Sequence, residues 1–462
     1  MSAVDMSNLT ATDEFAYRKR GVAEFVLVVV SIGIGVGAFA AVGLGLNGKL
    51  LPNFTLTSIW FAFLIFGAHA AIRRLAPYAD PTVLPIISAL NGMGLAMIER
   101  IHQTQSGTPK GETQLMWTTI GVLVFVGILA TLRDHRRLQA FTYTSAAAAV
   151  VLLLLPLVPG LGVPINGAQI WIHLGSFSFQ PGEVAKVLLI VSFAGYLVVH
   201  RDALALAGKR VLFIDLPRGR DLGPILAMWL IGLAILVFQN DLGFPFVLFG
   251  LFLVLLYVST ERPGWIVVGA VLALVGGVAA YLGVGHVRVR VQIWENPFAH
   301  ASGSGYQLVQ GFYGMAWGGL TGRGWGQGHP GITPFSYSDF MSASIGEELG
   351  LTGLLAVLVL YTLLVERGLR TALISRDNFG KLLATGLATV TVLQVFAVVG
   401  GVIGLIPLTG LTTPFLSYGG SSLISNWAVA AILLRVSDQA RRPLPRWNAD
   451  DDSDQTAVVV LR

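Results

Sequence analysis

The chain has 462 residues, of which 54% are hydrophobic and 12% charged, and its mean hydropathy is +0.72. This composition excludes the soluble globular classes. The net charge of +5 does not indicate nucleic-acid binding, because the basic residues form short clusters between apolar runs. The absence of cysteine excludes disulfides, thiolate metal sites and thiol nucleophiles.

Apolar runs of about 20 residues recur along the chain, and a helix of that length crosses roughly 30 Å of hydrocarbon. Basic residues precede the first run and no small-residue cleavage site follows it, so we expect this run to be retained as a span. The sequence therefore predicts an all-α polytopic membrane protein with about 12 transmembrane helices, at 23–45, 56–73, 82–98, 115–132, 139–158, 183–200, 223–239, 241–259, 264–285, 345–365, 381–406 and 422–436.

Lys and Arg are unevenly distributed between alternate loops. One set of loops contains clusters such as Arg18–Arg20 and Arg133–Arg137, whereas the other set has isolated residues such as Lys49 and Arg288. Because cytoplasmic loops carry the excess of positive charge, both termini are predicted to be cytoplasmic. The predicted organisation is a cytoplasmic N-terminal segment, a transmembrane domain and a disordered cytoplasmic tail, at 1–22, 23–436 and 437–462.

The segment 286–344, before the tenth predicted span, is far longer than an ordinary connection and is placed on the outer side. Its aromatic residues favour an ordered lid at the membrane interface. They are Trp294, Phe298, Tyr306, Trp317, Trp325, Phe335 and Tyr337.

Two patches of ionisable residues lie at the outer ends of spans, where charged groups are costly and usually serve a purpose. Glu183 and Lys186 open one span, and their spacing places them on one helix face. Asp241 lies in a very short connection between two spans. A local ion pair and a helix cap are the structural alternatives to a functional role for these residues.

A third patch, TPFSYSDFMSASIGEELG, ends the long loop and contains Asp339. Ser344 and Glu347 have the spacing of a capping box for the next helix. This leaves Asp339 available for chemistry, while Glu347 and Glu348 are assigned mainly to structure. Other motifs fail, because no phosphate loop, metal-ligand spacing or Ser/His/Asp set can be argued from the sequence.

At these patches the chain resembles the SEDS family (shape, elongation, division and sporulation), the RodA/FtsW type of peptidoglycan polymerase, and most of all its actinobacterial RodA branch. The motifs that carry the resemblance occur in order as NGAQIWIHLGSFSFQPGEVAK, QNDLG, ENPFAHASGSGYQLVQGFYGMAWGGLTGRGWGQG, SDFMSASIGEELG and IGLIPLTGLTTPFLSYGGSS. Two departures are that Gln169 and Ile170 replace basic residues, and that Asn240 replaces a proline, which we expect to relax that turn.

The resemblance implies an inverting glycosyltransferase in a bacterial plasma membrane. It would polymerise lipid II into glycan strands for elongation and shape, release the polyprenyl diphosphate and work with a class B penicillin-binding protein. Asp339 matches the aspartate essential for catalysis, and burial would raise its pKa toward that of a useful general base. The residues expected to bind substrate are Glu183, Lys186, Asp241, Arg290 and Ser417. Lys186 and Arg290 would face the leaving diphosphate, where a divalent cation (Mg or Mn) is the cofactor left open.

Three alternatives stay open at this point. A lipid II flippase or other transporter would place its binding groups near the membrane midplane, but the ionisable groups here cluster at the outer ends of spans. A division-type (FtsW) polymerase would share the motifs. A non-catalytic scaffold would need only the binding surface for its partner.

Overall fold

The computed structural model describes residues 19–104, 110–165, 167–175, 177–204, 207–211, 214–217 and 223–443. The predictions for the first 18 residues and for the acidic end of the chain, with Asp450 to Asp452 and Asp454, lie outside these described residues.

Long apolar helices dominate the described residues, as the sequence predicts. Eleven of them are long and apolar enough to cross a membrane. They are α2 (Gly21–Asn47), α3 (Phe54–Leu75), α4 (Val83–His102), α5 (Lys110–Thr131), α6 (Thr142–Leu154, flanked by η1 His135–Phe141 and η2 Leu155–Leu157), α7 (Pro181–Leu204), α9 (Gly243–Thr260), α10 (Gly264–Gly283), α14 (Gly350–Ile374), α15 (Asn378–Val402) and α16 (Gly420–Arg441). The remaining predicted span, 223–239, corresponds to α8 (Gly223–Gln239), a helix of 17 residues.

Small residues allow some of these helices to approach closely. A Cβ atom on Gly35 of α2 would lie only 2.9 Å from the Cα atom of Gly92 in α4. Helices that share a membrane gain little from hydrophobic burial against each other, so close backbone contact of this kind is a main source of their packing energy.

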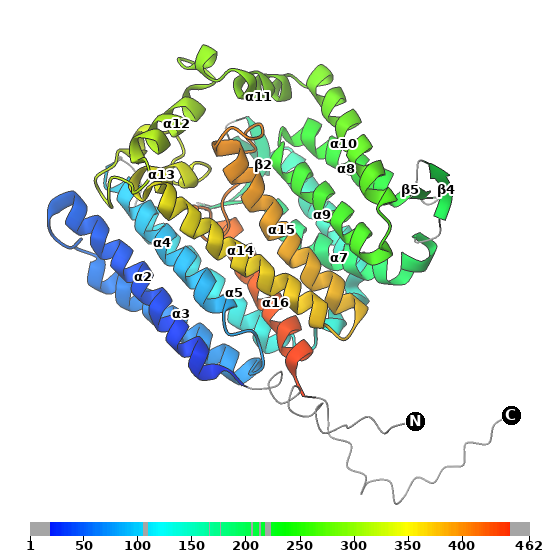
Figure 1. Cartoon of the computed structure of the whole chain (residues 1–462), viewed down its shortest axis with the longest axis horizontal. Helices are drawn as coiled ribbons and strands as arrows, with labels where there is room; N and C mark the ends of the chain where they lie inside the picture. Colours follow the sequence, from blue (N-terminus) through cyan, green and yellow to red (C-terminus); the bar gives the residue numbers. More distant parts are fainter. Residues whose placement is uncertain are drawn as a thin grey trace, which may run out of the picture.

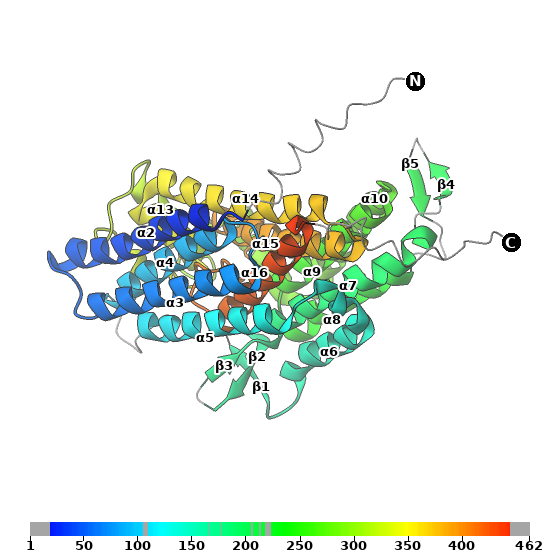
Figure 2. The ribbon, with the colours of Figure 1, turned by 90° about the horizontal axis from the view of Figure 1, so that it is seen from below.

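The buried side chains form two large clusters on either side of α16. One cluster is built mainly from α2 to α5 and α14, and the other mainly from α6, α7, α9 and α15. Helix α16 contributes to both, with Trp427 in the first and Val429 in the second. Figures 1 and 2 show α16 among the other long helices, between these two groups.

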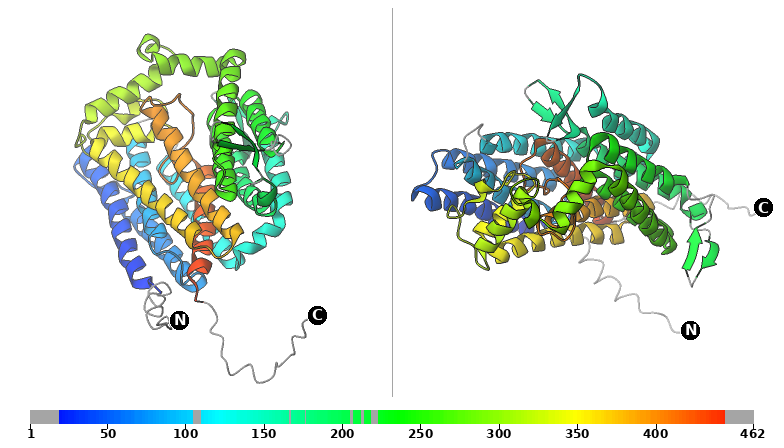
Figure 3. Two further views of the ribbon diagram at one scale, coloured as in Figure 1. Left: turned by 45° about the vertical axis from the view of Figure 1, so that its right-hand side comes forward. Right: turned by 90° about the horizontal axis from the view of Figure 1, so that it is seen from above.

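The segment after α10 is ordered, as expected for a lid. It contains α11 (Gly285–Glu295), η4 (Phe298–His300), α12 (Tyr306–Gly318), η5 (Pro330–Ile332) and α13 (Met341–Glu348). Helices α11 and α12 lie along the edge of the molecule opposite the start of α2 and the end of α16 (Figures 1 and 3). We call the side with α11 and α12 the lid face and the opposite side the terminal face.

Two small antiparallel sheets were not predicted. One has the order β1 (Gly162–Ile165), β2 (Ala168–Leu174) and β3 (Phe177–Phe179), and the other pairs β4 (Ala207–Val211) with β5 (Ile214–Pro217). The three-stranded sheet projects to one side of the helices (Figure 2).

Two predicted boundaries are wrong. The tenth span begins at Gly350 and not near residue 345, because Gly350 has a left-handed φ of 70° and separates α14 from α13. Ser344 and Glu347 therefore lie inside α13 and form no capping box. The hydroxyl of Ser344 donates to the Ser336 carbonyl (3.0 Å), and Glu347 accepts from the backbone N–H of His329 (2.5 Å). At the other end, α16 continues to Arg441, so 437–441 is not part of a disordered tail.

Candidate functional site

A cavity of about 520 Å³ opens on the lid face, and we call it the lid cavity. Its walls come from α11, the start of α12, the segment before α13 and the connection between α15 and α16. The polar residues that line it are Asn240, His286, Arg290, Ser304, Gln307, Asp339 and Thr409. Asp339 and Arg290, which were predicted separately, are therefore brought to one site.

The backbone on the N-terminal side of Asp339 is held by the connection that precedes α16. The hydroxyl of Ser417 donates to the Ser338 carbonyl (2.6 Å) and accepts from the N–H of Thr413 (3.0 Å). The N–H of Tyr418 donates to the Tyr337 carbonyl (2.8 Å). Ser417 is buried and does not line the lid cavity, so in this structure it positions the segment that carries Asp339.

The carboxyl group of Asp339 is partly exposed to the cavity and otherwise surrounded by protein. Burial raises the pKa of Asp339 from 3.8 to about 7. The nearby charge of Asp241 also raises this pKa, whereas the Ser338 hydroxyl and Arg290 lower it. A group with a pKa near the working pH is well suited to take a proton, and this agrees with the direction expected from the sequence.

Arg290 supplies the positive charge in the cavity wall. One of its guanidinium nitrogens donates to the Leu408 carbonyl at 2.5 Å. Burial lowers the pKa of Arg290, while the charges of Asp241 and Asp339 raise it. Arginine stays protonated in such surroundings, so the site contains one fixed cation and two carboxyl groups that interact with it.

Asp241 lies just behind this wall, in the turn between α8 and α9. It is buried and accepts a hydrogen bond from the N–H of Gly243 (2.9 Å), the first residue of α9, but the N-cap of α9 is Leu242, so the predicted capping role is wrong. Burial raises the pKa of Asp241, whereas the N–H groups of Gly243 and Phe244 and the charge of Arg290 lower it.

Asn240 has a defined backbone conformation, and its expected relaxing effect on the turn stays a prediction. Its φ of 55° is left-handed, a conformation that asparagine tolerates and proline cannot adopt. The side-chain amide donates to the Gly167 carbonyl (3.2 Å), which ties this turn to the turn between β1 and β2. The replacement of proline therefore goes with a specific, hydrogen-bonded turn in the cavity wall.

Glu183 and Lys186 form the predicted ion pair within α7, with an N–O distance of 2.7 Å. Both side chains are buried, and neither lines the lid cavity. The ammonium group also donates to the side-chain oxygen of Gln394 (2.8 Å), whose amide donates to the Thr412 carbonyl (2.8 Å). Sequence reasoning missed Gln394, although a lone amide in the apolar run VTVLQVFAVV was a visible signal.

The structural assignment of Glu348 is confirmed. It accepts from the guanidinium of Arg100 (2.7 Å) and from the N–H of Gly326 (3.0 Å), while Arg100 also donates to the Gly328 carbonyl (2.6 Å). Burial raises the pKa of Glu348, and Arg100 lowers it. This buried network fixes the lid between α12 and α13. Among the described residues, no group of three or more His, Cys, Asp or Glu side chains could hold a metal ion.

Comparisons with known proteins agree with this architecture. The model of the FtsW/RodA/SpoVE family, described as cell cycle proteins, matches residues 81–442. The chain belongs to this family. The match ends at Arg442, one residue after α16, and therefore covers the lid cavity and every predicted site residue.

Two curated relatives are peptidoglycan glycosyltransferases named RodA. The Mycobacterium tuberculosis protein is 49% identical over 84% of this chain and 85% of its own length. The Mycobacterium leprae protein is 46% identical over 83% of each chain.

Two solved structures have the same fold. A chain from a peptidoglycan synthase complex that coordinates polymerisation and crosslinking is 28% identical, with a TM-score of 0.63, and is matched over 78% of this chain and 98% of its own. RodA of Thermus thermophilus is 25% identical, with a TM-score of 0.54, over 78% and 96% respectively.

Proposed function

We propose that the chain is a peptidoglycan glycosyltransferase of the RodA type, that it polymerises lipid II into glycan strands, and that Asp339 is its general base. The activity follows from family membership and from the names of the mycobacterial relatives. The observation that supports the catalytic assignment is a carboxyl group with a pKa of about 7 facing a cavity that also contains a guanidinium group.

The reaction needs one base and one displacement. Asp339 accepts the proton of the acceptor sugar's hydroxyl as that oxygen forms a bond to the anomeric carbon of the donor. The bond between this carbon and the diphosphate oxygen breaks at the same time, so the configuration inverts and the polyprenyl diphosphate leaves. Negative charge grows on the diphosphate, and the guanidinium of Arg290 is placed to stabilise it.

The remaining predicted residues support this site from behind. Asp241 lies close enough to Arg290 and Asp339 for its charge to raise the pKa of both groups. Glu183 and Lys186 form their own buried pair away from the cavity lining, so we propose that they act through α15, which Lys186 contacts at Gln394 and which lines the cavity with Val398 and Val402. Ser417 fixes the backbone of Ser338 and is proposed to act as a positioning residue.

The chain is a multi-pass membrane protein. We place the terminal face in the cytoplasm, because the Arg-rich loops and the ends of α14 and α16 lie there. The lid cavity then opens on the outer surface of a bacterial plasma membrane, where a lipid-linked sugar is available.

A class B penicillin-binding protein is the proposed partner, supported by the synthase complex that shares this fold. A divalent cation also remains a proposal. The described residues form no metal cage of their own, so Mg or Mn would arrive with the substrate's diphosphate, and no step above depends on it.

The test is reconstitution of the full-length protein in liposomes with fluorescent lipid II, with and without the partner. We expect glycan polymer of several disaccharides, seen by gel electrophoresis and destroyed by a muramidase. Movement of the headgroup across the bilayer without any polymer would identify a flippase and overturn the proposal. Absence of both activities, together with tight binding of the partner, would identify a scaffold.

A further inference from the structure

We propose that the terminal face carries a binding site for the phosphate group of an anionic ligand, filled by the headgroup of an anionic phospholipid. The site is a second cavity, of about 450 Å³, which we call the arginine cavity. It is separate from the proposed catalytic site, since no residue lines both cavities.

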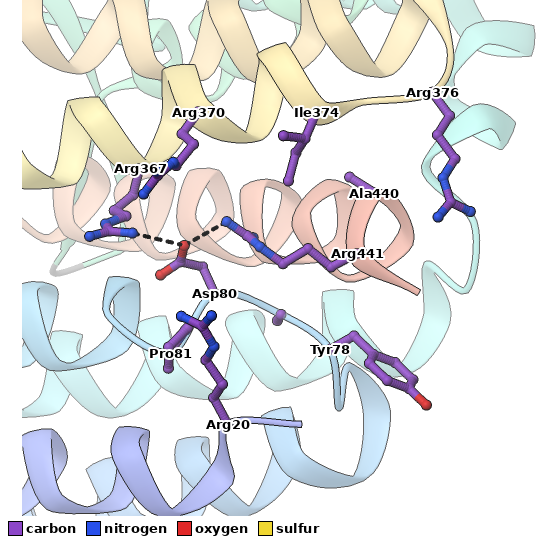
Figure 4. A pocket seen from close by; sticks show the side chains of 11 residues that line it. Arg20, Tyr78, Asp80, Pro81, Arg367, Arg370, Ile374, Arg376, Ala440 and Arg441 are labelled. Carbon is purple, nitrogen blue, oxygen red and sulfur yellow. Dashed lines mark hydrogen bonds and ion pairs between the residues drawn. The ribbon is translucent and has the colours of Figure 1, made fainter. Parts of the chain in front are cut away.

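Four segments that are far apart in the sequence form the arginine cavity. Arg20 directly precedes α2, Tyr78–Pro81 connects α3 to α4, and Arg441 is the last residue of α16. Arg367, Arg370 and Ile374 come from the final turns of α14, and Arg376 follows it. Figure 4 shows Arg20, Arg367, Arg370 and Arg441 on the sides of Asp80, with Arg376 farther away at the right. Because five membrane helices (α2, α3, α4, α14 and α16) begin or end here, we place the cavity where hydrocarbon gives way to headgroups.

The charges in this cavity are strongly unbalanced. Five guanidinium groups line it, from Arg20, Arg367, Arg370, Arg376 and Arg441, against the single carboxylate of Asp80. Arg441 lies 2.7 Å and Arg367 4.0 Å from that carboxylate, as the dashed lines in Figure 4 show. The ammonium of Lys19 lies at the edge, 5.6 Å from the ring centre of Tyr78.

The single charge of Asp80 cannot neutralise five guanidinium groups, and the oxygens of Asp80 also accept hydrogen bonds from neutral donors. One accepts from the N–H (3.0 Å) and hydroxyl (2.6 Å) of Thr82, and the other accepts from Arg441. Glu366, outside the cavity, lies 3.0 Å from Arg367 and 3.9 Å from Arg370. Arg20 makes no ion pair with any described residue. The lining of the cavity therefore carries a net positive charge, which favours the binding of a further anion.

The chemistry of the lining favours a phosphate group. Planar guanidinium groups donate paired hydrogen bonds to phosphate oxygens, and several converging arginines favour a compact anion over a diffuse one. Ile374 and Ala440 add apolar surface beside the charges, which suits the glycerol and acyl ends of a lipid. Anionic lipids are the abundant phosphates at this depth, and they attract basic residues at the cytoplasmic surface.

Native mass spectrometry of the full-length protein in neutral detergent tests this proposal. The protein is titrated with phosphatidylglycerol, with phosphatidylcholine of the same acyl chains, and with inorganic phosphate. We expect one tightly bound phosphatidylglycerol, and at least about tenfold weaker binding of it in the Arg20→Gln/Arg370→Gln variant.

The matched control is Arg74→Gln/Arg137→Gln, which removes two exposed arginines that do not line the arginine cavity. We expect it to change the binding by less than about twofold. A second variant, Ile374→Glu, keeps every arginine and adds a carboxylate to the lining, so it must weaken binding by repulsion even if the first variant folds poorly.

Equal binding of the two lipids, or binding unchanged in both cavity variants, would overturn the proposal. So would binding of an acidic peptide in the absence of any phosphate binding, which would indicate a protein-docking site. Displacement of the lipid by millimolar inorganic phosphate, lost in the same variants, would support the phosphate site but assign it to a soluble ligand.

Discussion

The lid cavity and the arginine cavity are similar in volume but opposite in their balance of acidic and basic side chains. The lid cavity brings two carboxyl groups close to one guanidinium. Burial, together with the nearby charge of Asp241, raises the pKa of Asp339 to about 7. The arginine cavity sets five guanidinium groups against one carboxylate, which is held by several donors. The first arrangement suits proton transfer, because its charge changes near neutral pH. The second has a fixed charge and suits binding.

The comparison is tested most severely by Asp339→Asn. The amide cannot accept the proton, so we expect polymerisation to fall by about 10³-fold, in the range of a lost general base. Polymer formation from purified lipid II is the measurement, and Asp202→Asn, an exposed carboxylate at the end of α7, is the control. Polymerisation at the wild-type rate would show that Asp339 is not the base.

Arg100→Ala tests whether the paired charges of the lid are structural. Removal of one partner leaves Glu348 buried without its cation, which we expect to cost about 3–5 kcal/mol of stability. The expected result is a markedly lower Tm in detergent, measured by intrinsic fluorescence, with loss of the ordered lid in hydrogen exchange. Arg323→Ala is the control, because Arg323 belongs to the same lid but is exposed and stacks on Trp317 (3.8 Å to the ring centre) instead of pairing with a buried carboxylate. A Tm equal to that of the control variant would contradict this role.

Arg290→Gln removes the cation of the lid cavity. We expect polymerisation to fall by about 10²-fold, since the leaving diphosphate loses its stabilising charge. Arg290 also lowers the pKa of Asp339, so its loss raises that pKa further. The wild-type rate should fall as the pH drops through about 7, and the variant's fall should begin at higher pH. Arg290→Lys keeps the charge and should keep most of the wild-type pH profile. If the pH profile of Arg290→Gln matched that of the wild type, Arg290 would not influence the pKa of Asp339.

Ser417→Ala is expected to have the smallest effect. It removes the hydroxyl that holds the Ser338 carbonyl, so Asp339 is less well placed and kcat falls by about tenfold. A positioning role predicts an unchanged KM for lipid II, whereas direct substrate binding by the hydroxyl predicts a higher KM. Ser417→Thr should restore most of the rate, because it retains the hydroxyl.

The sequence was sufficient for the helices and for the candidate base, because apolar run length and a polar residue beside a span are local signals. The sequence was not sufficient to predict which of these side chains lie together in one cavity. Asp339 and Arg290 are separated by the whole of α12, and their meeting depends on how α11 crosses the lid face. A role for Gln394 cannot be predicted from the sequence, because a single amide in an apolar helix gives no indication of its partner, which in the structure is Lys186.

Local rules also failed where tertiary contacts overrode them. Ser344 and Glu347 have ideal capping spacing, but the left-handed Gly350 creates a separate short helix and places both inside it. From the sequence, the arginines of the arginine cavity are interpreted as topology signals, and the orientation that they indicate stays a prediction. Nothing in the sequence indicated that Arg20, Arg370 and Arg441 would converge, since their convergence requires the start of α2 and the ends of α14 and α16 to meet.

The left-handed turn at Asn240 limits how this protein can change over evolutionary time. A substitution of Asn240 by proline cannot be accommodated alone, because the ring forbids the observed φ of 55° and removes the amide bonded to Gly167. Such a change would have to rebuild the turn and the neighbouring hairpin together. Aspartate and glycine suit this left-handed backbone, but neither can donate to the Gly167 carbonyl, so either replacement would release the hairpin from the cavity wall.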